Sequence, residues 1–225
     1  MKIKIAYLYY DLLNLYGDNG NIKALEKRIK NQNIDVVIDY LSISDKKNFN
    51  DYDLIYIGSG TKKNTLIALN DLIKYKNELK KYVNDNKFIL ATGNSLELFG
   101  KTIKIDETHN ALNICDFIVE YNDNRIVKNA LYSCDFLKNE IIGFENHNGK
   151  IISNEDYLFE NEGVHKNNFF GTYIIGPILI RNPEFCKYFI KELILSKDNN
   201  YEIIEDDYEY EELAYELNKK ELEKK

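Results

Sequence analysis

Residues 88–100 read FILATGNSLELFG, which is an apolar run, a turn of small residues and a second apolar run. This order predicts a strand that turns sharply into a helix, the geometry of a nucleophile elbow. At such an elbow the central residue is strained and projects at the mouth of the sheet, while backbone N–H groups at the helix start stabilise an anion. The central residue here is Gly93, which has no side chain. By itself the pattern is a weak signal, since a glycine after a strand is more often just a turn.

A second turn of small residues follows another predicted strand. Gly58, Ser59 and Gly60 come directly after the apolar residues 54–57. This turn is able to bring backbone N–H groups toward the same edge of the sheet as the elbow. We therefore expect Ser59, Gly60 and Asn94 to form an oxyanion-like loop, although a glycine after a strand often marks only a turn.

Strand and helix patterns alternate on the N-terminal side of the elbow. Strands are predicted at residues 2–9, 35–41, 54–57 and 88–90, and helices from residue 22 to 29 and over 65–83. This alternation favours an α/β fold with a mostly parallel sheet flanked by helices. The second half is rich in strands, predicted at residues 125–131, 141–145, 150–153 and 169–180, before a helix over 184–195. We expect one domain over residues 1–200 and an acidic C-terminal helix or tail over 201–225 that packs on it or extends from it.

The composition excludes several classes of protein. The chain has 225 residues, of which 44% are hydrophobic and 13% aromatic, so it can bury a core and is not disordered. No run approaches the roughly 18 to 20 apolar residues that a membrane span needs. The start, MKIKIAYLYY, lacks the regions of a signal peptide, so we expect a cytoplasmic protein.

The charge and the cysteines narrow the choice of partners and cofactors. The net charge is −7, and residues 201–225 hold ten acidic against four basic side chains. Because phosphate binding needs a concentrated basic surface, we expect no nucleic acid partner. The three cysteines, Cys115, Cys134 and Cys186, show neither a disulfide framework nor zinc spacing, which indicates small buried residues. No metal, nucleotide or other cofactor is expected, since the glycines at 17 and 20 do not form a phosphate-binding motif.

Longer motifs resemble those of one protein family. Residues 8–21 (LYYDLLNLYGDNGN) are close to the pattern L-Y-P-D-L-L-N-L-Y-G-D-R-G-N, with departures mainly at Tyr10 and Asn19. Further matches are GFENH at 143–147, EG at 162–163, GTY at 171–173, GP at 176–177 and NP at 182–183. On these motifs nearly the whole chain resembles the CobB/CobQ-like class I glutamine amidotransferases. Within that family it is most similar to GatD-type subunits, which act with a Mur-ligase-like partner, MurT, in amidating the peptidoglycan precursor lipid II.

The resemblance implies a class I amidotransferase-like, flavodoxin-like fold, in which an elbow Cys attacks the amide of glutamine and a His activates it. The family pattern L-A-V-C-G-G-Y-Q-L-L-G aligns without a gap with residues 90–100, which places Gly93 at the nucleophile. The pattern G-T-Y-L-H-G-P aligns with residues 171–177, which places Ile175 at the His. Glycine has no nucleophile and isoleucine carries no proton, so both catalytic groups are missing.

Several other residues are conceivable substitutes for the missing pair. Thr92 and Ser95 are the nearest hydroxyls, but neither has the elbow position, and Thr92 is only a weak candidate. His147 and His165 are interpreted as structural or surface residues rather than as a relocated base, and Cys115 and Cys134 as core. Arg125 matches a family arginine and either meets a substrate carboxylate or is a solvated cation at a strand edge.

Three functions remain open at this point. The first is a GatD-type subunit that is inactive as a glutaminase and serves as the binding or regulatory subunit of a Mur-ligase-like partner in a heterodimer. The second is an enzyme that still releases ammonia from glutamine through a rearranged site. The third is a sensor that binds glutamine, or a related amide, without turnover.

Overall fold

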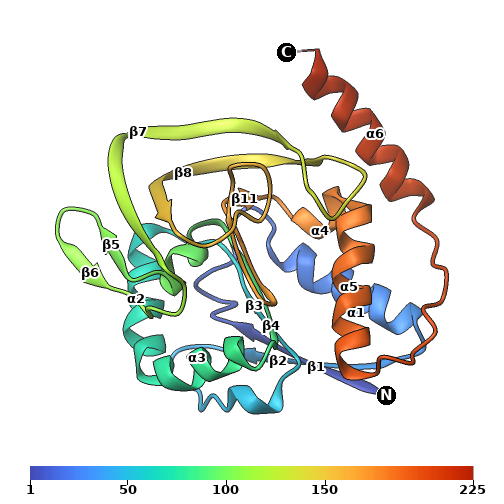
Figure 1. The fold of residues 1–225 in the computed structure, drawn as a ribbon, viewed down its shortest axis with the longest axis horizontal. Coiled ribbons are helices and arrows are strands. Elements are labelled where there is room, and N and C mark those ends of the chain that lie inside the picture. The colour runs from blue at the N-terminus through green and yellow to red at the C-terminus, as the bar shows by residue number, and fades with distance from the viewer. Residues whose placement is uncertain (225) are drawn as a thin grey trace.

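The computed structural model describes residues 1–224 and contains two sheets (Figure 1). The first sheet has the order β2-β1-β3-β4-β10-β9 and the second the order β11-β8-β7-β5-β6. The strands of the first sheet are β1 (Lys2–Leu8), β2 (Asp35–Leu41), β3 (Leu54–Ile57), β4 (Phe88–Thr92), β9 (Val164–Lys166) and β10 (Phe169–Thr172). Those of the second are β5 (Thr102–Lys104), β6 (Thr108–Asn110), β7 (Phe117–Tyr132), β8 (Ile141–Ser153) and β11 (Ile174–Ile175).

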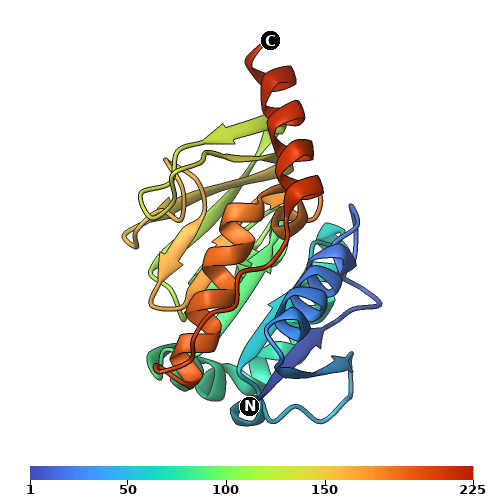
Figure 2. The same cartoon turned by 90° about the vertical axis from the view of Figure 1, so that its right-hand side faces the viewer.

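Helices cover the first sheet on both faces, and its strands pair in parallel except for β9 with β10. Alternate side chains of the strands enter two cores. One core joins the sheet to α2 (Lys62–Leu72) and α3 (Lys76–Asn84), and the other joins it to α1 (Asn19–Asn31) and α5 (Pro183–Lys197). Figure 2 shows α1 and α5 side by side on one face. The predicted α/β class, with a mostly parallel sheet between helices and a strand-rich second half, is confirmed.

The helix expected over residues 65–83 is not continuous. The structure has α2, a 3-10 turn at Ile73–Tyr75 and then α3. The turn leaves Ile73 partly exposed and reorients the chain, so that Leu69 and Leu72 before it and Leu79 after it enter the same core. The run after the elbow is also tighter than an α-helix, because Gly93–Phe99 forms a 3-10 helix.

Two strand boundaries were predicted wrongly. Residues 141–145 and 150–153 belong to one strand, β8, because the polar residues between them pair with β7, as His147 does with Ile126. Conversely, residues 169–180 are not one strand. They divide into β10 in the first sheet, β11 in the second and the short helix α4 (Ile178–Arg181), because Gly176 adopts a φ of +77° and Pro177 follows it.

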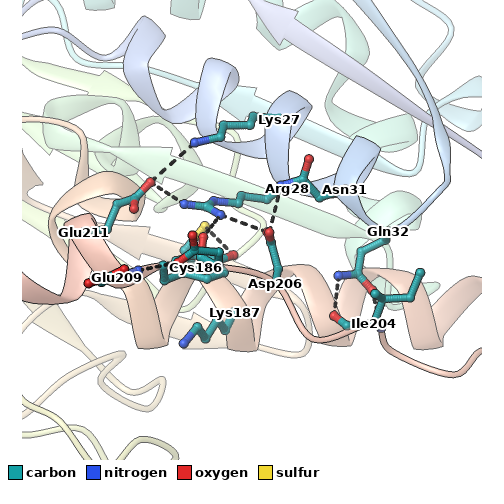
Figure 3. A network of polar contacts seen from close by, with 12 residues as sticks. Lys27, Arg28, Asn31, Gln32, Cys186, Lys187, Ile204, Asp206, Glu209 and Glu211 are labelled. Carbon is teal, nitrogen blue, oxygen red and sulfur yellow. Dashed lines mark hydrogen bonds and ion pairs between the residues drawn. The ribbon is translucent and has the colours of Figure 1, made fainter.

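The C-terminal segment returns across α1 before forming α6 (Glu209–Glu223). Arg28, whose side chain is 4% exposed, binds the carboxylates of Asp206 and Glu211. Figure 3 shows Arg28 between these two carboxylates, and its guanidinium also lies 3.7 Å from the ring centre of Tyr208. This network attaches the beginning of α6 to α1. Among residues 1–224 no helix is long and apolar enough to cross a membrane.

Candidate functional site

Asp18 lies at the start of α1 and is completely buried. Its carboxylate accepts hydrogen bonds from the backbone N–H of Ser59 and from the hydroxyls of Thr92 (3.1 Å) and Tyr56 (3.3 Å). Burial raises the pKa of Asp18 to about 7, although these hydrogen bonds favour the charged form. The carboxyl group therefore connects the opening segment, residues 8–21, to the ends of β3 and β4.

Gly93 follows β4 and has a φ of +62°, a backbone conformation that side chains rarely adopt. A Cβ atom added here would lie 2.4 Å from Oγ and 2.5 Å from Cβ of Ser59, and 3.0 Å from Cγ2 of Ile175. Real Cβ atoms do not approach other atoms to 2.5 Å. The backbone thus has the shape of an elbow, while Ser59 occupies the space that a nucleophilic side chain needs.

Ile175 is buried at the end of β11, where it pairs with Phe144 of β8. Its contact with the space above Gly93 brings together the two positions that the family resemblance assigns to the catalytic pair. Its Cγ2 methyl group lies beside the space that a side chain at position 93 would enter. Gly93, Ile175 and Ser59 therefore form one packed cluster.

Ser59, Gly60 and Asn94, the residues of the predicted oxyanion-like loop, lie together, but the N–H groups of Ser59 and Gly60 are engaged within the protein. The N–H of Gly60 donates to Oδ1 of Asn94 (3.0 Å), and Nδ2 of Asn94 donates to the carbonyl of Gly60 (2.9 Å). The N–H of Ser59 donates to Asp18. In this conformation neither N–H is available to an oxyanion.

The two hydroxyls beside the elbow are also engaged. The Thr92 hydroxyl donates to Asp18 and lies 3.2 Å from the hydroxyl of Tyr56. The Ser95 hydroxyl lies 2.9 Å from the carbonyl of Thr92 and 3.0 Å from that of Ile57. Both side chains are buried, so neither faces solvent as an attacking group.

A cavity of about 540 Å³ opens next to this cluster. Ser59, Gly60, Asn94 and Arg125 line it, whereas Thr92, Gly93 and Ile175 do not. The cavity also carries both signs of charge, from Lys62 and Arg125 and from Asp106 and Asp123. Nε of Arg125 donates to Oδ1 of Asn146 (2.6 Å), and this contact holds the guanidinium at the cavity. The site therefore keeps a polar cavity while the nucleophile position is buried beneath Ser59.

Both the sequence and the fold are similar to those of known proteins. Residues 4–183 match the profile of the CobB/CobQ-like glutamine amidotransferase domain. The chain belongs to this family. It is 32% identical over 224 residues to the lipid II isoglutaminyl synthase (glutamine-hydrolyzing) subunit GatD of Staphylococcus aureus, covering 93% of this chain and 92% of that protein. The GatD subunit of Streptococcus pneumoniae is 28% identical, with coverage of 80% and 76%.

A solved structure supports the fold alone. A crystal structure of a glutamine amidotransferase superposes with a TM-score of 0.56 at 14% identity. The match covers 84% of this chain and 98% of that one. The chain thus has the fold of a glutamine amidotransferase.

His147 is a cavity residue that the sequence reading of this amidotransferase chain did not assign to the site. Its ring stacks on Tyr173 with centres 3.8 Å apart. Nδ1 lies 2.8 Å from the carbonyl of Gly149 and Nε2 lies 3.0 Å from Oε2 of Glu145. Burial raises the pKa of Glu145, but the hydrogen bonds from His147 and Tyr132 outweigh it and leave that pKa below its usual value. Since both ring nitrogens already face acceptors, His147 is held in place rather than presented to a nucleophile.

Glu97 is a second site residue that sequence reasoning missed. It is 1% exposed, and its carboxylate accepts hydrogen bonds from the hydroxyls of Tyr121 (2.8 Å) and Tyr173 (3.1 Å). Burial raises the pKa of Glu97 to about 7. Tyr121 and His147 both line the cavity, and Tyr173 stacks on His147. Glu97 therefore holds one cavity residue directly, and a second one through Tyr173. An acid within the apolar run LELF was the available signal.

The three cysteines and His165 lie away from the cavity. Cys115, Cys134 and Cys186 are free and buried, and none lines the cavity. Burial raises the pKa of Cys115 to about 12 and that of Cys134 to about 11, which suppresses the reactive thiolate. His165 belongs to β9, and burial lowers its pKa.

Proposed function

We propose that this chain is a GatD-type subunit that does not hydrolyse glutamine and that binds a Mur-ligase-like partner in the amidation of a peptidoglycan precursor. The observation that carries the proposal is the cluster at the elbow. Gly93 has no nucleophile, Ile175 has no basic group, and Ser59 fills the space above Gly93. Thioester chemistry needs a thiolate and a proton carrier in contact, and this cluster supplies neither.

The framework around the missing pair supports a role that depends on shape. Asp18 and Asn94 still hold the turn after β3, and the cavity still carries Arg125. We infer that the chain stabilises or regulates its partner, which then uses ammonia from another source. The cytoplasmic location and the heterodimer expected from the sequence are part of this proposal.

The deciding experiment measures the glutamate that the purified chain releases from glutamine, alone and together with the proposed Mur-ligase-like partner, co-expressed with it. We expect no release in either case. Clear turnover would overturn the proposal in favour of an active enzyme with a rearranged site. Labelling by a glutamine-like chloroketone would then identify the nucleophile, with Thr92→Val as the first variant to examine.

A matched set of variants shows whether only the elbow cluster blocks catalysis. Gly93→Cys with Ile175→His restores the missing groups, but Ser59 still collides with the new side chain. We therefore expect turnover only when Ser59→Gly is added to that pair. The double and triple variants differ by Ser59 alone, so a comparison of the two isolates its effect.

The cavity supports a second candidate, a sensor of glutamine or a related amide. Arg125 and Lys62 suit a carboxylate, while Asp106 and Asp123 suit an ammonium group, so the lining offers partners for both charged groups of an amino acid. Calorimetry with glutamine and the chain alone tests this function. A sensor binds ligand without its partner, whereas a purely scaffolding subunit gives no heat of binding.

A further inference from the structure

The side chain of Asn94 is bound by the turn after β3 in the way that a small amide molecule would be. Its Oδ1 atom accepts hydrogen bonds from the N–H of Gly60 (3.0 Å) and from the hydroxyl of Ser59 (3.3 Å). Its Nδ2 atom donates to the carbonyl of Gly60 (2.9 Å). Two donors thus converge on the oxygen of one carboxamide, and one acceptor faces its nitrogen.

The polar groups of this turn select a primary amide over the other polar groups of amino acids. A primary amide has an acceptor oxygen beside an N–H donor, which is the arrangement that Gly60 requires. A carboxylate has acceptors only, so one of its oxygens would face the Gly60 carbonyl without a hydrogen. An ammonium group has donors only and would leave the N–H of Gly60 unpaired. We call Ser59 and Gly60 the amide subsite.

The amide subsite opens onto the cavity beside the elbow. Ser59, Gly60 and Asn94 line this cavity together with Arg125, and its volume of about 540 Å³ lies within the range of small-molecule sites. The side chain of Asn94 is half-buried, and its backbone belongs to the 3-10 helix Gly93–Phe99. A ligand whose amide entered the subsite would therefore have to displace the amide that the protein already holds there.

We propose that Asn94 is a tethered internal ligand, which occupies the amide subsite and competes with glutamine for it. This inference rests on the proposed function, a subunit that does not hydrolyse glutamine, and deepens it. Gly93 and Ile175 account for the missing chemistry, whereas Asn94 makes the cavity selective against ligands that carry a primary amide.

Competition by Asn94 is effective because this residue is part of the chain. It loses no translational freedom when it binds Gly60, whereas glutamine from solution does. The apparent affinity for glutamine equals the intrinsic affinity reduced by the fraction of molecules in which the Asn94 side chain has left the subsite. The hydrogen bonds that Asn94 exchanges with Gly60, at ordinary net strength, reduce the apparent affinity by roughly 10- to 100-fold.

The test is calorimetry of the full chain with glutamine and with glutamate as ligands. Asn94→Ala removes the internal carboxamide, and we expect the Kd for glutamine to fall at least about tenfold. The Kd for glutamate should change by less than about threefold, because its side-chain carboxylate cannot donate to the Gly60 carbonyl. Asn94→Ser carries a short hydroxyl that cannot bridge both groups of Gly60, so it should give a smaller gain. It also serves as the opened variant if Asn94→Ala does not fold.

Asn64→Ala is the matched control for these variants. Nδ2 of Asn64 also donates to a backbone carbonyl, that of Leu12 (3.0 Å), and its side chain is likewise half-buried. It does not line the cavity. We expect the Kd for glutamine to stay within about threefold of the wild-type value. Circular dichroism checks that the control and the Asn94 variants are folded.

The outcomes separate this inference from the proposed function. An unchanged Kd for glutamine in the Asn94 variants, or an equal gain for glutamate, would overturn the inference. So would a lack of glutamine binding in the wild type and in every variant. In these cases the proposed function stands as long as the wild type releases no glutamate from glutamine. Release by the wild type would overturn the proposed function itself, whatever the calorimetry shows.

Discussion

The opening segment, residues 8–21, and the elbow around Gly93 lie against each other, yet they differ in how far they depart from the family pattern. In the opening segment, Asp18 binds the turn after β3, and Asn21 binds the hydroxyl of Tyr56 (2.9 Å) and the N–H of Leu179 (3.0 Å). At the elbow, Gly93 and Ile175 stand at the two positions that the family resemblance assigns to the residues that act on substrate. The difference suggests that residues with partners inside the protein are retained, while residues that served only the reaction are replaceable.

The largest expected effect tests the retained region. Asp18→Ala removes the acceptor for the Ser59 N–H and for the hydroxyls of Thr92 and Tyr56. The Tyr56 hydroxyl keeps the backbone carbonyl of residue 18 (3.1 Å) and the Thr92 hydroxyl keeps the hydroxyl of Tyr56 (3.2 Å), but the Ser59 N–H is left buried without a partner. Loss of this charge-assisted bond should lower the free energy of unfolding by about 3 kcal/mol, measured by urea denaturation. Asp18→Asn keeps the size and one acceptor oxygen and should cost less. A loss below about 1 kcal/mol for Asp18→Ala would mean that the internal contacts of Asp18 do not stabilise the fold, and the contrast with the elbow would then fail.

The next prediction tests how tightly Ser59 packs against Gly93 at the elbow. Gly93→Cys introduces a Cβ at positive φ and into contact with Ser59, so we expect a loss of about 2 kcal/mol in unfolding free energy. Adding Ser59→Gly should recover part of that loss, because the collision disappears while the backbone strain remains. A cycle that includes Ser59→Gly alone measures the coupling between the two positions. Additive effects would show that Ser59 does not block the elbow.

Glu97 follows the elbow, binds Tyr121 and Tyr173, and should give the chain a distinct pH dependence. Its pKa is about 7 in the folded protein against 4.5 for an ordinary solvated glutamate, so the folded state binds the proton more tightly. This contribution to stability is present below about pH 4.5 and is lost as the pH rises toward 7. Glu97→Gln should make the fall of unfolding free energy between about pH 5 and 7 shallower by up to about 1.4 kcal/mol per pH unit.

The matched control for Glu97 is Glu216→Gln, an exposed glutamate without an ion pair among residues 1–224. It should leave the pH dependence unchanged. Asp18 and Glu162, whose pKa values burial also raises, to about 7 and about 8, keep part of the dependence in the Glu97→Gln variant. An unchanged slope for that variant would mean that Glu97 does not hold its proton in the folded state.

The smallest effect on stability is expected at Arg125, which faces the cavity and is exposed. Arg125→Ala should change the unfolding free energy by no more than about 0.5 kcal/mol. If the cavity binds glutamine, the same variant should weaken that binding at least about tenfold in calorimetry, because it loses a charge-assisted contact with the carboxylate. A loss of stability above about 1 kcal/mol would place Arg125 with the retained framework instead.

The sequence predicted the central strands of the first sheet well, because β3 and β4 are buried on both faces and are mostly apolar, as Leu54–Ile57 is. It missed β9 and merged β10 with the residues that follow it. It predicted the second sheet poorly. In β8 the polar residues around His147 resemble a turn, and only their pairing with β7 keeps them in a strand. The break at Ile73–Tyr75 depends on the direction in which α3 must run to reach its core, which apolar spacing alone does not specify.

The elbow itself could be located from residues 88–100, but its packing could not. That Ser59 fills the space above Gly93 depends on two turns, 34 positions apart, meeting at one edge of the sheet. The same holds for Glu97, whose partners Tyr121 and Tyr173 come from other strands and turns. Local pattern identifies which residues are missing, while the contacts that close the site arise only from the tertiary fold.

The Arg28 network also affects the order in which parts of the chain fold during synthesis. Arg28 and Asp206 are 178 positions apart, so α1 is synthesised long before its partners. At about 5–20 residues per second, roughly 10 to 35 s pass before Asp206 exists, and until then the guanidinium has only water to satisfy it. Helix α1 therefore acquires its final surroundings last, when the C-terminal segment closes over it and positions α6.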